Sequence, residues 1–482
     1  MRSQIVSRWD DGAFLNNFWE AGANWDNGIP NGIGDSAIFG NDPGGAGFEE
    51  VILGSNKRVG ALTFEGDEHS YGIRSTFLNT DPRRLNFEET GGGNANVSVT
   101  GNQEHVIGFV PDAEQGIFIR LFDDLLIENN STATNGLTIG TLSDDQEIRL
   151  RGFDLTVDGS SRTTIHSLIR NGQAGSNSVT KNGSGILRLT DPGNVFSGGV
   201  VLNDGTIEIG SNAALGSGDF TINGGSVEAF GAARTISNDY TINDDYSVEG
   251  TNDLTFSGEG TLAAGAQQIT VADPSVTHTL SGTLSGAGGL VKEGDGTLAF
   301  SGGSKTFTGD IVVNEGTLLL GSNDQIGNST NMVLAGGTFN TNNFDEVLGT
   351  LTLNADSTID FGDTPGDGSI LQFADSSAVP WDPGATLTII NWEGIVGTGN
   401  GIDQLFFGSD GNGLSPTQRS QIVFADFPGD ETIQLADGEV VPVPEPAAIA
   451  ATLGLAALIG WRERKRIAQI SLRIRDFKKD QL

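Results

Sequence analysis

Apolar and polar residues alternate along most of this chain with a period of two. In EIRLRGFDLTVDG (147–159), apolar residues such as Ile148 and Leu150 are separated by polar ones, and LTLNADSTIDFGD (351–363) has the same pattern. This period is typical of a β-strand with one buried face. We find no convincing amphipathic helix before residue 447, so the sequence predicts an all-β fold.

Short glycine-rich segments separate the apolar runs. They include NDG (203–205), INGG (222–225) and NEG (314–316). Glycine adopts the positive φ angles that tight turns require. With 71 Gly, only 14 Pro and 36% hydrophobic residues, the composition favours the thin core of a stacked, repetitive architecture over a large globule.

The chain contains an internal repeat. A shift of 111 positions places residues 181–218 on residues 292–329 without a gap. The shared positions include Gly183/Gly294, Gly185/Gly296, Leu187/Leu298, Phe196/Phe307, Asn203/Asn314, Gly205/Gly316 and Gly210/Gly321. Repeated strand–turn units with constant corner residues are typical of a solenoid, in which each coil covers the apolar face of the previous one. A row of sandwiches and a propeller are the competing all-β interpretations.

The second copy resembles a known repeat. In residues 284–322, the Gly-Gly-Leu before Lys292, the GDGTL turn and strand, Phe307-Thr308-Gly309 and NEGTLLL resemble the autotransporter-associated β-strand repeat of secreted bacterial proteins. The resemblance implies a right-handed parallel β-helix with an extracellular, passenger-like role. We expect coils of about 20–25 residues. The two repeat copies should lie on equivalent coils, with Phe196 and Phe307 pointing the same way.

Both ends of the predicted solenoid differ from its middle. We assign residues 1–50 to an N-terminal cap segment, 51–385 to the solenoid and 386–440 to a C-terminal cap module. The opening stretch 18–40 resembles the start of such surface proteins, and its Trp19 and Trp25 serve either as a seal on the first coil or as a sugar-stacking platform. The aromatic residues expected to pack in the C-terminal module are Trp392, Phe406, Phe407 and Phe424.

The charge is strongly acidic and unevenly distributed. The net charge is −36, yet residues 462–482 carry eight basic and three acidic side chains, which leaves 18 basic and 59 acidic ones before them. An acidic body of this kind repels nucleic acid and anionic lipid, and we expect no nucleic-acid partner. The chain has no Cys, which excludes disulfides, thiol nucleophiles and cysteine metal sites.

The C-terminal segment contains the most specific motif. A Pro-Glu-Pro is followed by 15 uncharged residues (447–461) and then a basic cluster. This order resembles the PEP-CTERM sorting signal, which implies an exosortase-type processing enzyme as partner and a membrane-spanning C-terminal segment before processing. The predicted sorting-motif residues are Val443, Pro444, Glu445, Pro446, Arg462, Arg464, Lys465 and Arg466.

The physical properties of this segment agree with that interpretation. At 1.5 Å per residue, a 15-residue helix spans about 22 Å, less than the roughly 30 Å of a bilayer core. Its insertion is therefore expected to be transient, with the basic cluster retained in the cytoplasm. Residues 467–482 extend beyond the usual signal as a basic tail. The first 14 residues lack an apolar export region, so we expect a longer reading frame upstream of Met1.

Enzyme motifs are scarce in this sequence. The four His (69, 105, 166 and 278) lack metal-ligand spacing, and no cofactor is expected. Asn79-Thr80-Asp81 and Asp123-Asp124 superficially resemble the carboxylates of β-helix polysaccharide hydrolases. We interpret the chain as a non-catalytic, structural or adhesive protein of the cell surface or extracellular matrix, with exopolysaccharide as a candidate partner. A glycan-binding β-helix module and a polysaccharide lyase or hydrolase are the alternatives.

Overall fold

The computed structural model describes residues 3–10, 17–40, 47–75, 83–108, 116–141, 146–172, 175–364, 366–427, 431–443 and 461–467. These form two compact units, residues 1–333 and 334–482, and the division falls within the segment 51–385. We describe each unit by itself.

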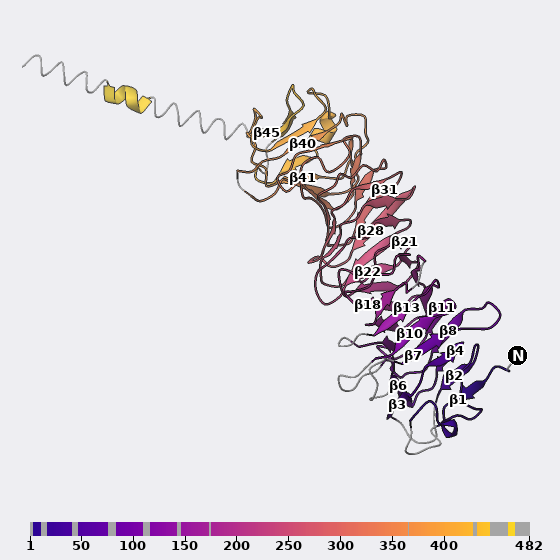
Figure 1. The fold of residues 1–482 in the computed structure, drawn as a ribbon. Helices are drawn as coiled ribbons and strands as arrows, with labels where there is room; N and C mark the ends of the chain where they lie inside the picture. Colours follow the sequence, from indigo (N-terminus) through magenta and orange to yellow (C-terminus); the bar gives the residue numbers. More distant parts are fainter. Residues whose placement is uncertain are drawn as a thin grey trace, which may run out of the picture. The chain divides into compact units, whose positions relative to one another are not determined.

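The first unit is a parallel β-helix whose coils have three faces, which confirms the predicted all-β solenoid. The chain passes from the first face to the second and the third, and then begins the next coil. Each strand pairs in parallel with the strand one coil later, as Figure 1 shows for β7, β10 and β13.

The strands of the first face, in stacking order, are β1 (Val6–Arg8), β2 (Ser36–Phe39), β5 (Ala61–Phe64), β8 (Ala95–Val99), β11 (Leu125–Asn129), β14 (Leu155–Asp158), β17 (Val179–Lys181), β19 (Val200–Leu202), β21 (Phe220–Ile222), β24 (Tyr240–Ile242), β27 (Gly260–Leu262) and β30 (Leu284–Gly286). The strands of the second face are β3 (Gly47–Leu53), β6 (His69–Ser75), β9 (His105–Ile107), β12 (Leu137–Ile139), β15 (Arg162–Ile165), β18 (Ile186–Leu189), β20 (Thr206–Ile209), β22 (Ser226–Ala229), β25 (Tyr246–Glu249), β28 (Ala266–Val271), β31 (Gly289–Glu293) and β33 (Ile311–Val313).

The third face consists of two separate sheets. The first contains β4 (Lys57–Val59), β7 (Arg84–Phe87), β10 (Phe118–Leu121), β13 (Glu147–Arg149) and β16 (Leu168–Arg170). The second contains β23 (Arg234–Ile236), β26 (Leu254–Phe256), β29 (Thr277–Leu280), β32 (Thr297–Phe300) and β34 (Thr317–Leu320). A short 3-10 helix, η1 (Gly22–Asn24), lies near the start of the unit, and β35 (Met332–Leu334) lies at the division between the units.

Alternation along each strand builds the core. On the first face, Leu202, Ile222, Ile242 and Leu262 occupy successive positions of one inward row, and each is at most 1% exposed. Burial of an aliphatic side chain of this size stabilises the fold by about 1.5–3 kcal/mol. The core is therefore a thin stack of apolar rows, as the low hydrophobic content predicts.

Coil length varies along the unit. Val200 pairs with Phe220, Phe220 with Tyr240 and Tyr240 with Gly260, so each of these coils has 20 residues. Nearer the N-terminus the coils exceed the predicted 20–25 residues: Val6 pairs with Ser36, a step of 30. Longer connections between the strands account for the difference, because the strands themselves stay short.

The two repeat copies fold alike but lie on different faces. Adding 111 to the bounds of β18, β19 and β20 gives those of β32, β33 and β34, and Phe196 and Phe307 are both buried, as predicted. The expectation that the copies occupy equivalent coils is wrong. On the first face, five successive coils lead from Val179 to Leu284. The residue of the second copy that corresponds to Val179 is Leu290, which comes six residues after Leu284 and lies on the second face. Each copy therefore holds the same corner twice, on two successive coils: between β17 and β18 and between β19 and β20 in the first copy, and between β31 and β32 and between β33 and β34 in the second.

The second unit also stacks short parallel strands. One sheet contains β36 (Thr338–Asn340), β39 (Ser357–Asp360), β41 (Leu387–Ile390) and β43 (Ile422–Phe424), and another contains β37 (Glu346–Leu348), β40 (Ile370–Phe373) and β42 (Gln404–Phe407). The unit also holds β38 (Leu351–Leu353), the four-residue helix α1 (Pro416–Arg419) and the antiparallel pair β44 (Glu431–Gln434) and β45 (Val440–Val443).

Aromatic packing in the second unit follows the alternation. Trp392 packs on Phe424 with ring centroids 4.8 Å apart, and both side chains are buried, as expected. Phe407 is also buried and stacks on Phe373 at 5.2 Å. Phe406 corrects the expectation, because it is half-exposed. Adjacent residues of a strand point to opposite faces, so Phe406 and Phe407 do not enter the same core.

We expect Gly205→Ala to destabilise the first unit by about 2 kcal/mol or more. Gly205 has a φ of +71°, and an added Cβ would lie 2.3 Å from the Gly185 carbonyl oxygen, so a close contact adds to the left-handed strain of about 1–2 kcal/mol. Gly231→Ala is the matched control, because Gly231 has a φ of +78° but its Cβ would meet nothing closer than 3.7 Å. Urea unfolding of both variants measures the difference. Equal costs would show that the close contact at the corner contributes nothing.

Candidate functional site

The predicted sorting residues begin at the end of β45, the last described strand of the second unit, and follow it in the sequence. Val443 is the last residue of β45, and Pro444, Glu445 and Pro446 lie outside the described residues, as does the apolar stretch up to Gly460. A helix at 461–467 carries the basic residues Arg462, Arg464, Lys465 and Arg466, all exposed. Within the described part of the chain, no helix has the length and hydropathy that a membrane crossing requires.

The basic cluster has internal contacts of its own. The Lys465 ammonium lies 3.7 Å from the centre of the Trp461 ring, and Arg466 pairs with Glu463 at 3.3 Å. Both contacts are exposed and contribute little stability. Most of the basic charge therefore remains accessible.

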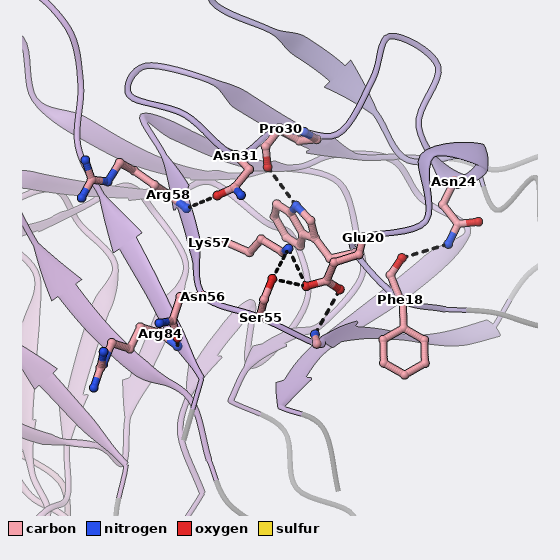
Figure 2. A network of polar contacts seen from close by, with 12 residues as sticks. Phe18, Glu20, Asn24, Pro30, Asn31, Ser55, Asn56, Lys57, Arg58 and Arg84 are labelled. Atoms are coloured by element: carbon pink, nitrogen blue, oxygen red, sulfur yellow. Dashed lines mark hydrogen bonds and ion pairs between the residues drawn. The ribbon is translucent and has the colours of Figure 1, made fainter. Parts of the chain in front are cut away.

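The N-terminal tryptophans belong to the core. Trp9, Trp19 and Trp25 are at most 4% exposed, and Trp25 packs on the other two rings with centroids 5.1 and 5.0 Å away. The Trp19 indole N–H donates to the Pro30 carbonyl at 2.9 Å (Figure 2). Because these rings are covered, they form a packed cluster and do not present a stacking platform to a sugar.

An ion pair between the buried Lys57 and the half-buried Glu20 lies beside this cluster (Figure 2). The Lys57 ammonium lies 2.5 Å from a carboxylate oxygen of Glu20, and the same oxygen accepts a hydrogen bond from Ser55 at 2.6 Å. Burial raises the pKa of the Glu20 carboxyl, but the hydrogen bonds from Lys57 and Ser55 outweigh it, so the net pKa is lowered. Both charges are compensated within the fold, so the network connects the first coils.

The candidate catalytic carboxylates of Asp123 and Asp124 accept hydrogen bonds from backbone N–H groups. The Asp123 carboxylate accepts the backbone N–H of Glu89 at 2.7 Å, and Asp124 accepts that of Asp154 at 2.9 Å. These carboxylates connect neighbouring coils and do not form a converging acid–base pair. Asn79-Thr80-Asp81 lies outside the described residues.

Three of the four histidines are buried, namely His69, His105 and His278. Burial lowers the pKa of His105 to about 4 and that of His278 to about 4 as well. The Nε2 atom of His278 lies 2.7 Å from the Tyr246 hydroxyl oxygen. The rings of His105 and His278 are therefore neutral near pH 7. In the regions that the structure describes, no three His, Asp or Glu side chains come together as a metal site requires.

The repeat contains a buried lysine that the sequence analysis did not single out. Lys181 is 1% and Lys292 0% exposed. Each ammonium donates to the carbonyl oxygens of the residues one, two and 23 positions later, which for Lys292 are Glu293, Gly294 and Glu315 at 2.7, 2.6 and 3.2 Å. Lysine has three N–H donors, so all three are satisfied. A Lys at the first position of both copies was the available signal.

An asparagine ladder follows the same corner in four coils. The amide N–H of Asn203 donates to the side-chain oxygen of Asn182, that of Asn223 to Asn203, and that of Asn243 to Asn223, at 2.7–2.8 Å. Together with the lysines, this ladder satisfies polar groups where the strands end. The repeated corner therefore combines a buried, fully hydrogen-bonded lysine with hydrogen bonds between side chains of neighbouring coils.

Comparison with known proteins identifies this corner. Residues 179–209 and 290–320 match the passenger-associated-transport repeat. The predicted repeat is therefore confirmed. A stretch of 78 residues, 16% of this chain, is 40% identical to the adhesin BmaC autotransporter of Brucella suis biovar 1 (strain 1330), and it covers 2% of that protein's length. No solved structure matches this chain.

The buried lysines predict an unusual pH dependence. Burial lowers the pKa of Lys181 and Lys292 to about 8, whereas an unfolded lysine retains its proton to about pH 10.4. The folded state releases these protons first, so its stability should rise between pH 8 and about pH 10. Above about pH 10, tyrosine ionisation in the unfolded chain opposes this rise, because burial raises the pKa of Tyr240 and Tyr246.

Thermal unfolding across this range measures the effect. We expect the unfolding temperature of the full chain to rise from pH 7.5 to 9.5, and the double variant Lys181→Met/Lys292→Met to lose most of the rise. Lys465→Met, which removes an exposed ammonium, is the control and should behave as the unaltered chain. An identical pH profile for the double variant would contradict the prediction.

Proposed function

We propose that this chain is a non-catalytic, structural or adhesive protein of the bacterial cell surface or extracellular matrix. The observation that carries the proposal is the pair of passenger-associated-transport repeats. Each repeat folds into corners of a β-helix, where a buried lysine donates hydrogen bonds to backbone carbonyl groups. The similarity of 78 residues to an autotransporter adhesin supports the same class of function.

The enzymatic alternative has little support in the described residues. A glycan-cleaving β-helix needs two carboxyl groups that face the scissile bond. Asp123 and Asp124 instead accept backbone N–H groups of neighbouring coils. Their role in connecting coils favours a structural surface protein.

We further propose that an exosortase-type enzyme reads the C-terminal segment and removes it. Support comes from the order Pro444-Glu445-Pro446, uncharged stretch and basic cluster. In the sequence, Pro444-Glu445-Pro446 comes directly after Val443, the end of the last described strand, so the motif lies outside the described sheets. Removal would separate the strongly acidic body from its basic tail.

We expect Glu445→Ala to leave uncleaved protein in the membrane of the native host, because the enzyme would no longer recognise its motif. Mass spectrometry of the surface and membrane fractions measures this, and the unaltered protein should lack peptides from 467–482 at the surface. Glu431→Ala is the control, because it removes an exposed acidic side chain from β44 and leaves the motif intact. Stoichiometric recovery of 467–482 with the unaltered body, or normal processing of Glu445→Ala, would contradict the sorting proposal.

A further inference from the structure

The positive charge of the first unit is concentrated on one face. Six arginines lie on or just after the strands of the first sheet of the third face, which are β4, β7, β10, β13 and β16. They are Arg58, Arg84, Arg120, Arg149, Arg151 and Arg170. We call these six residues the arginine strip. Residues 1–461 contain only 18 basic side chains against 59 acidic ones, so a third of the positive charge lies here.

Strand register aligns the strip. Arg120 pairs with Arg149, and Arg149 pairs with Arg170, while Asn86 lies between Arg120 and Arg58. These residues form one row across five coils, with a spacing of about 4.8 Å between neighbouring strands. Their strand neighbours, such as Ile119 and Ile148, are buried, so the row points outward.

Acidic side chains compensate only part of this charge. Glu88 pairs with Arg58 at 3.1 Å, and Glu147 pairs with Arg149 and, at 3.1 Å, with Arg170. Arg84, Arg120 and Arg151 form no ion pair with any described residue. Burial and the neighbouring guanidinium groups of Arg84, Arg149 and Arg151 lower the pKa of Arg120. Like charges on adjacent strands destabilise a sheet, and an anion bound across the row would relieve that cost.

Two phenyl rings separate and support the guanidinium groups. The Arg58 and Arg151 groups lie 5.1 and 4.4 Å from the centre of the Phe122 ring, and that of Arg149 lies 5.7 Å from Phe118. These contacts hold the guanidinium planes in place, which reduces the entropy lost when an anion binds. Two guanidinium groups occupy the Phe122 ring and one occupies the Phe118 ring, which leaves less ring surface for stacking with nucleic-acid bases.

We propose that the arginine strip binds an anionic polysaccharide whose carboxylate or sulfate groups recur along its length. A single row of guanidinium groups at strand spacing suits a linear chain with one anionic group per sugar or per disaccharide, laid along the stacking direction. Arginine binds carboxylate and sulfate oxygens in a bidentate way. The proposal names a class of ligand for the adhesive function. It rests on the proposed function only in that a protein at the cell surface would encounter such a polysaccharide there.

The acidic remainder of the chain favours a polysaccharide over nucleic acid. Nucleic acid carries a dense row of phosphates and binds mainly through its charge. The 59 acidic side chains of residues 1–461 outnumber the 18 basic ones and repel such a polymer outside the strip. A polysaccharide with more widely separated charges experiences less of this repulsion.

Binding of defined polymers to the full chain tests the proposal. Isothermal titration with polygalacturonate supplies the carboxylate arm, dextran sulfate the sulfate arm and unmodified dextran the neutral control. We expect both charged polymers to bind, more weakly as salt is raised, and dextran not to bind. The double variant Arg120→Gln/Arg151→Gln removes two unpaired outward charges and should weaken binding about tenfold.

Arg234→Gln is the matched control. Arg234 lies on β23 in the other sheet of the third face, and its guanidinium donates two hydrogen bonds to the Phe230 carbonyl oxygen. This variant should bind as the unaltered chain, and unfolding temperatures of all variants establish that they are folded. Failure of both charged polymers to bind at low salt, or equal losses in the two variants, would overturn the proposal. Tighter binding of a single-stranded oligonucleotide than of either polysaccharide would also overturn it.

The outcome is separable from that of the proposed function. Detection of the protein at the cell surface together with no polymer binding would refute the arginine strip and leave the surface role intact. Polymer binding by the purified chain together with a location away from the surface would refute the surface role instead.

Discussion

The need to hydrogen-bond every coil to the next determines most of this structure. Parallel strands satisfy their backbone groups on the faces, but each corner leaves carbonyl and N–H groups that water reaches poorly. Lys181 and Lys292 satisfy three carbonyl groups each, and Asp239 and Asp253 accept N–H groups from the next coil at 2.8 Å. Polar residues at corners are therefore structural, and part of the acidic composition serves to connect coils.

The fold class could be predicted from the sequence because alternation and corner residues are local signals. The strand 147–149 and the buried Phe196 and Phe307 follow directly from them. The face on which each repeat copy lies could not be predicted, because it depends on the summed length of all intervening connections. One corner motif fits between the first and second faces and again between the second and third, so its sequence contains no information about the face.

The arginine strip could likewise be predicted only in part from the sequence. A net charge of −36 suggests a uniformly acidic body, yet six arginines converge on one sheet. The local signal was present, because alternation in EIRLRGF places Arg149 and Arg151 opposite Ile148 and Leu150. Their alignment with Arg120 depends on coils of unequal length, which only the register reveals. The sorting residues, in contrast, form a linear motif and could be recognised without a structure.

This separation between inward and outward positions explains how a thin solenoid can support a binding surface. Stability resides in the buried rows and the corners, where a substitution disturbs neighbouring coils. Outward positions such as Arg120 lie outside the buried apolar rows, so a substitution there leaves the packing of those rows in place. Because the coils repeat, a single favourable position recurs at strand spacing. A row of half-buried, outward-pointing charges then acts together on a polymer, although each charge alone contributes little.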